Sequence, residues 1–207
     1  MNKEIASVLK SKLINNDTIK CFDLIAGLVQ TGIKHSGTEA QIVIKKMPIS
    51  YDTNINGSCE SQKEQILVPD STKKGILYFE DQGLKFIENE RGNNQIWRSK
   101  LRLVAWLNRN LIVGETYTEI TSFIVTDVID KLTNKGRVEN IGQFNKFKVT
   151  PLQMPPQDNS IFSEYSYDEA VTQYLRPPFE FFALDLVIDF GIHKSCLNSL
   201  ILKEKKC

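Results

Sequence analysis

Two stretches of the chain place their apolar residues at helical spacing. In Asn2–Ile14, four aliphatic side chains share one face, which predicts a short amphipathic helix. Tyr117–Leu132 carries a longer apolar stripe, and Thr116–Glu119 before it fits a capping box, in which a hydroxyl and a carboxylate satisfy unpaired backbone N–H groups. Asn134–Gly136 is a helix stop. The pattern therefore predicts an opening helix and a capped central helix.

Apolar runs, most of them alternating with polar residues, predict strands in the rest of the chain. The tripeptide Asp81–Gly83 separates two such stretches and predicts a hairpin turn, because its glycine tolerates positive φ. Pro48 is expected to end the strand before it. Arg91–Asn94 favours a strand over a helix for the segment that follows it. The predicted strands are Ile19–Val29, Gln41–Met47, Gly75–Glu80, Leu84–Glu88, Ile96–Asn108, Phe144–Thr150 and Phe179–Ile192.

Two polar or proline-rich segments interrupt this pattern. Ser50–Lys74 is rich in Ser, Asn, Asp, Thr and Gly, and a stretch of this length inside a compact domain is typical of a functional or partner-ordered loop. Pro151–Tyr165 begins with a stiff, extended passage to Ser160 and precedes a second capping box at Ser166–Glu169. Both segments are predicted to be contact arms.

The elements together predict an α+β fold with a mostly antiparallel sheet, flanked by the N-terminal helix and the capped central helix. Residues 1–193 are expected to form one domain with an insertion loop at 50–74, and residues 194–207 a C-terminal tail. Leu197, Leu200 and Ile201 give this tail more apolar surface than a solvated terminus normally keeps. They are candidate inter-subunit contacts, and docking on the chain's own core is the open alternative.

Composition removes several classes of function. With 26 basic and 25 acidic residues the net charge is +1, so no global field attracts nucleic acid or an anionic membrane. No stretch has the roughly 20 apolar residues of a membrane-spanning helix, and the N-terminus lacks the apolar region of a signal peptide. The four cysteines are far apart, as expected of free thiols. We expect a protein made in the cytosol that does not contact a membrane.

Candidate catalytic and metal-binding residues are few. His35 and His193 have no partner at the spacing of a known motif. Asp185 and Asp189 could share one face of a strand and hold magnesium, but the Glu-x-Lys sequence of a metal-dependent nuclease does not follow. Ordinary carboxylates near a strand end are the simpler interpretation. We therefore expect no enzyme activity, no cofactor and no metal.

A basic strand interleaved with aromatic residues is the one candidate nucleic-acid site. Lys100, Arg102 and Trp106 could neutralise phosphates and stack bases, or line the lumen of a ring. Pairing of the basic residues with acids on a neighbouring strand is the alternative.

The order of elements resembles the small α+β neck and tail proteins of tailed bacteriophages, of the tail-terminator type. The elements that carry the resemblance are the opening helix, the strands through Ile19–Val29 and Gln41–Met47, the hairpin, the capped helix and the strand Pro178–Ile192. Asn, Ile and Lys are frequent, as is typical of proteins from AT-rich genomes. This composition and the proline-rich passage resemble a ring protein of a crAss-like phage.

This resemblance implies a structural virion protein that forms a homo-oligomeric ring in a neck or tail, as a head–tail connector or tail terminator. It would be made in the host cytoplasm and assembled into the virion, with other copies and neighbouring neck or tail proteins as partners. Six and twelve copies both remain open, as does sequence-independent contact with DNA. The alternative is a nucleic-acid-binding accessory protein that uses the strand of residues 97–109.

Overall fold

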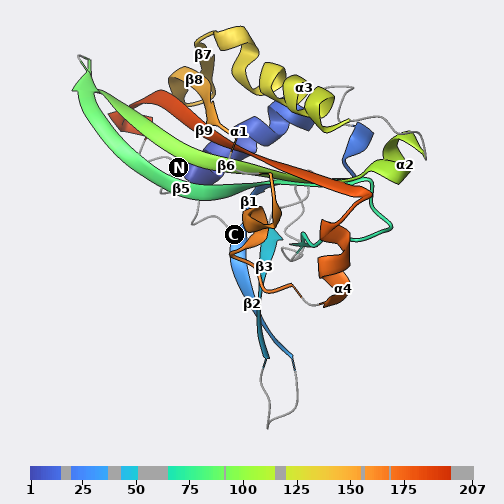
Figure 1. The fold of residues 1–207 in the computed structure, drawn as a ribbon. Helices are drawn as coiled ribbons and strands as arrows, with labels where there is room; N and C mark the ends of the chain where they lie inside the picture. The colour runs from blue at the N-terminus through green and yellow to red at the C-terminus, as the bar shows by residue number, and fades with distance from the viewer. Residues whose placement is uncertain are drawn as a thin grey trace, which may run out of the picture.

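A six-stranded sheet forms the centre of the molecule in the computed structural model (Figure 1). The structure describes residues 1–14, 20–36, 43–50, 65–90, 92–114, 120–154, 157–167 and 169–196. Only the first pair of strands is parallel, and the other pairs are antiparallel. The fold thus combines helices with an antiparallel-dominated sheet. In spatial order the strands are β1 (Leu24–Leu28), β5 (Gly75–Glu90), β6 (Asn94–Asn108), β9 (Phe179–His193), β8 (Phe144–Gln153) and β7 (Glu139–Ile141).

The larger part of the core lies on one face of this sheet. Alternate side chains of β5, β6, β9 and β8 point to this face, as the period of a strand dictates. The helices α1 (Asn2–Ile14) and α3 (Thr121–Thr133) pack on it with their apolar stripes. Buried residues that meet here include Leu9, Leu13, Val128, Leu132, Leu103, Leu184, Phe147 and Phe190.

A smaller core covers only one end of the opposite face. The short helices η3 (Asn159–Phe162), α4 (Glu169–Thr172) and η4 (Gln173–Leu175) pack there around Trp106. They meet the neighbouring side chains Ile76, Tyr78, Val104 and Ala183 of the sheet. Towards the other end of the sheet this face carries polar and charged side chains instead.

A second sheet of three strands projects from the body (Figure 1). Its strands are β2 (Gln30–Ser36), β3 (Val43–Ser50) and β4 (Gln65–Ile66), in that order. The strands β2 and β3 pair antiparallel along their whole length and extend away from the six-stranded sheet. We call them together the β2–β3 arm.

The long strands β6 and β9 confirm the alternation seen in the sequence, but the hairpin predicted at Asp81–Gly83 is wrong. β5 continues through these residues, because they form a bulge against β6 in which Asp81 Oδ1 accepts the N–H of Gly83 at 2.7 Å. The actual turn follows Glu90 and uses positive φ at Gly92 (82°) and Asn93 (63°).

Two predicted strands were expected to end at a proline, and both continue through it. β3 does not end at Pro48 but runs to Ser50, and β2, which pairs with it, was not predicted. β8 likewise continues through Pro151 to Gln153. Pro151 lies beyond the part of β8 that β7 covers, where a missing N–H costs little. Pro48 lies opposite Thr31 of β2, and its carbonyl accepts the N–H of Leu67.

The central helix begins later than predicted and ends where predicted. α3 starts at Thr121, and Thr116–Glu119 lies outside the described residues. Its C-terminal cap is Asn134, in the left-handed conformation with φ 46°, followed by the turn η2 (Asn134–Gly136). The short helix α2 (Arg109–Val113) was not predicted. No helix among the described residues is both long and apolar enough to cross a membrane.

Candidate functional site

The uncovered part of the second face carries two ion pairs that run across the strands. Arg102 of β6 lies opposite Asp185 of β9, and its Nε donates to Asp185 Oδ1 at 2.7 Å. Arg98 lies opposite Asp189 and donates through Nε and Nη2 to the two carboxylate oxygens at 2.7 and 3.0 Å. Both contacts are forked guanidinium–carboxylate pairs, which fix the strand register as well as contribute energy.

The two pairs differ in exposure. The side chains of Arg102 and Asp185 are 28% and 17% exposed, against 45% and 37% for Arg98 and Asp189. An exposed pair contributes about 0.2–1 kcal/mol because water and salt screen it. Asp185 and Asp189 are thus each paired with an arginine. The described residues contain no cluster of three or more groups suited to a metal ion.

The three residues predicted to contact nucleic acid or a lumen are placed in different surroundings. Trp106 is buried, donates its indole N–H to the Tyr174 carbonyl at 2.7 Å, and stacks on Phe179 with 5.3 Å between ring centroids. Arg102 is held by Asp185, and only Lys100 is exposed. The sheet thus does not present them together as one stacking and phosphate-binding surface.

A buried carboxyl group lies at the inner end of this polar region. Glu80 on β5 is 6% exposed, and the Tyr165 hydroxyl donates to its Oε1 at 2.6 Å. Burial raises the pKa of Glu80 to about 7, although the Tyr165 hydrogen bond and nearby Arg102 lower it. The raised pKa brings the titration of this carboxyl group towards neutral pH. Burial and the Glu80 carboxylate also raise the pKa of Tyr165.

The open edge of β5 is the main irregularity of the sheet. β1 pairs with β5 only as far as Phe79, and no described strand lies beside residues 81–90 on that side, opposite to β6. Three apolar side chains of this stretch, Leu84, Phe86 and Ile87, are 37–40% exposed. Phe86 rests edge-on against Trp97 of β6, with 5.3 Å between centroids. The stretch offers both backbone hydrogen-bonding groups and apolar surface to a further strand.

The opposite edge of the sheet is built differently. β7 pairs with the first residues of β8, up to Phe147, and the described strands leave the rest of β8 uncovered. Pro151 lies in that uncovered part and has no N–H to offer a further strand. The two edges are therefore not equivalent.

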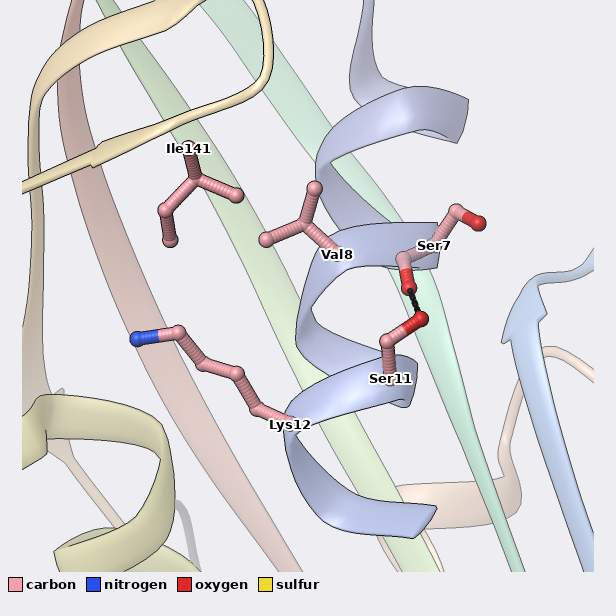
Figure 2. A pocket seen from close by; sticks show the side chains of 5 residues that line it. All are labelled: Ser7, Val8, Ser11, Lys12 and Ile141. Carbon is pink, nitrogen blue, oxygen red and sulfur yellow. Dashed lines mark hydrogen bonds between the residues drawn. The ribbon is translucent and has the colours of Figure 1, made fainter. Parts of the chain in front are cut away.

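A shallow groove of about 320 Å³ runs between α1 and the β7 strand (Figure 2). Val8 and Ile141 face each other across it, and Ser7, Ser11 and Lys12 complete its lining. The Ser11 hydroxyl donates to the Ser7 carbonyl at 2.9 Å, and the Lys12 ammonium group forms an ion pair with Glu139. The Ser11 hydroxyl and the Lys12 ammonium group are thus both satisfied within the chain.

No protein-family model matches this sequence, and no curated protein matches it significantly.

Several predicted residues lie elsewhere or outside the described part of the chain. His193, at the end of β9, shares a 2.7 Å hydrogen bond between Nδ1 and the Ser195 hydroxyl. Cys21 and Cys196 are thiols that are not joined in a disulfide. The tail residues Leu197, Leu200 and Ile201 lie outside the described residues.

Sequence reasoning missed Glu80 and the open edge. Glu80 stands at the end of an apolar run, GILYF, with no spacing that marks it as buried. The open edge was missed because a turn was expected at Asp81–Gly83, which would have divided β5 into two short strands. Two glutamates alternating at 88 and 90 were the only available sign of a strand that continues.

Proposed function

We propose that the chain is a structural virion protein, a ring-forming subunit of a bacteriophage neck or tail of the head–tail-joining or tail-terminator type. The open edge of β5 at residues 81–90 is the observation that carries this proposal. Native proteins usually shorten, cover or charge such an edge, since it is a template for pairing with another chain. An edge that keeps three half-exposed apolar side chains fits a surface that becomes covered on assembly.

A ring is built from head-to-tail contacts, in which one surface of a subunit binds a different surface of the next subunit. Such contacts form a ring when the rotation between successive subunits adds up to a full turn. The molecule offers different elements for such halves: the open edge on one part of the body and the projecting β2–β3 arm on another (Figure 1). Helices α1 and α3 lie together on one face of a mostly antiparallel sheet, which supports the resemblance to tail-terminator proteins.

The alternative, a nucleic-acid-binding accessory protein, has less support. It relied on Lys100, Arg102 and Trp106, and of these only Lys100 is exposed without being held in an ion pair across the sheet.

The mass and shape of the purified chain test the proposal. Light scattering over a range of concentrations should give a discrete assembly of several copies, and negative-stain images should show closed rings. A chain that stays monomeric at every concentration, with and without neighbouring neck or tail proteins, would contradict the proposal. Binding of DNA by that monomer, abolished by Lys100→Glu, would favour the alternative.

A further inference from the structure

The pairing of β1 with the edge of β5 ends at Phe79. β1 runs parallel to β5 until Val29, whose N–H donates to the Phe79 carbonyl at 2.8 Å. The next residues do not continue along β5 but leave the body as β2, which pairs with β3 alone among the described strands. The outer edge of β2 and the edge of β5 beyond Phe79 are thus both without a described neighbour.

The β2–β3 arm has an unbalanced charge. Its two strands contain Lys34, Lys45 and Lys46 and no aspartate or glutamate. Lys34 lies directly opposite Lys45 in the ladder. The arm as a whole is therefore basic, and an acidic surface is its complementary partner.

The open stretch of β5 has the complementary character. Residues 81–90 contain Asp81, Glu88 and Glu90 against a single lysine, Lys85, and no proline. Glu90 is already paired with Lys146 of β8, so Asp81 and Glu88 carry the remaining acidic charge. The ten residues are long enough for the seven of β2. Both elements also expose apolar surface: Ile33 of β2 is 60% exposed, and Ile87 of β5 40%. Charge, length and apolar content therefore match between two different elements of the same chain.

We propose that the β2–β3 arm of one copy lies along residues 81–90 of β5 in the next copy, with β2 added to the neighbour's sheet as a further strand. This inference rests on the ring proposed above and supplies its interface. The partner is a second copy of this chain, and the contact is head-to-tail, because arm and edge are different surfaces. Backbone hydrogen bonds would hold the added strand, while the lysines and the acidic edge would set its orientation.

A charge reversal in the arm tests this interface. Lys34→Glu removes one positive charge from the arm and adds a negative one, and the thermal midpoint of the monomer is measured beside it to show that the subunit still folds. Assembly should weaken, with the concentration at half-assembly rising about tenfold, since like charges across an interface are costly. The variant Lys34→Glu/Glu88→Lys should restore assembly. Lys135→Glu, an exposed site after α3, is the matched charge control.

Hydrogen exchange gives a second, independent measurement. The amides of residues 84–90 should exchange quickly in the monomer and slowly in the assembly, because an added strand gives their N–H groups partners. The inference is overturned, and the ring proposal stands, if the wild type assembles but Lys34→Glu assembles equally well, or if these amides exchange equally fast in both states. A wild type that never assembles would overturn both.

Discussion

Replacing Glu80 by glutamine should stabilise the subunit at alkaline pH and hardly change it in acid. The folded chain buries this carboxyl group, which raises its pKa from the ordinary 4.5 to about 7. A group with a raised pKa contributes stability that is fully present below the unfolded value of 4.5 and is lost as the pH rises through 7. At about 1.4 kcal/mol per pH unit, the loss between pH 4 and pH 8 amounts to about 3 kcal/mol. Glutamine carries no charge at either pH and keeps an oxygen for the Tyr165 hydroxyl.

Urea unfolding, followed by tryptophan fluorescence, measures this difference. The free energy of unfolding of Glu80→Gln minus that of the wild type should be about 3 kcal/mol larger at pH 8 than at pH 4, so the variant gains stability at high pH. Tyr165→Phe should act in the opposite sense, since it removes the hydrogen bond that favours the Glu80 carboxylate. Glu88→Gln, an exposed site on the same strand, is the control for losing one carboxyl group. Parallel pH profiles for Glu80→Gln and the wild type would refute the reasoning.

The two ion pairs and the buried indole give further predictions. Double-mutant cycles to alanine should give a larger coupling energy for Arg102–Asp185 than for Arg98–Asp189, whose coupling should stay below about 1 kcal/mol because both side chains are more exposed. In 1 M salt the second coupling should fall further than the first, and equal values would contradict this ranking. Trp106→Ala should lower the free energy of unfolding by about 3–5 kcal/mol, as expected of a buried aromatic residue, and a loss under 1 kcal/mol would show that the site tolerates the cavity.

The sequence predicted those parts of the fold whose alternation is fixed by the core. β9 has Phe182, Leu184 and Leu186 on one face, so the two-residue period of a strand could be recognised without knowledge of its neighbours. The same holds for β6. Strand ends were harder to predict. Pro151 lies where β8 has only β9 as a neighbour, and Pro48 lies inside β3 although that strand has neighbours on both sides.

The candidate site depended on information that a single strand does not carry. Asp185 and Asp189 read equally well as metal ligands or as ordinary carboxylates until the register placed Arg102 and Arg98 opposite them. Trp106 looked available for stacking because the short helices that cover it lie more than fifty residues later in the chain. Burial by distant segments is a tertiary effect, and periodicity alone does not reveal it.

The unequal edges of the sheet also bear on what an excess of free subunits would do in the cell. A sheet that accepted strands at both edges would extend into a ribbon, and ribbons stack into insoluble fibres. Here one edge is receptive and the other contains Pro151, which withholds the donor that each new layer would require. Edge-to-edge growth is therefore less favourable at the β8 edge than at the β5 edge. Replacing this proline should leave the fold intact and make the concentrated protein prone to fibrillation.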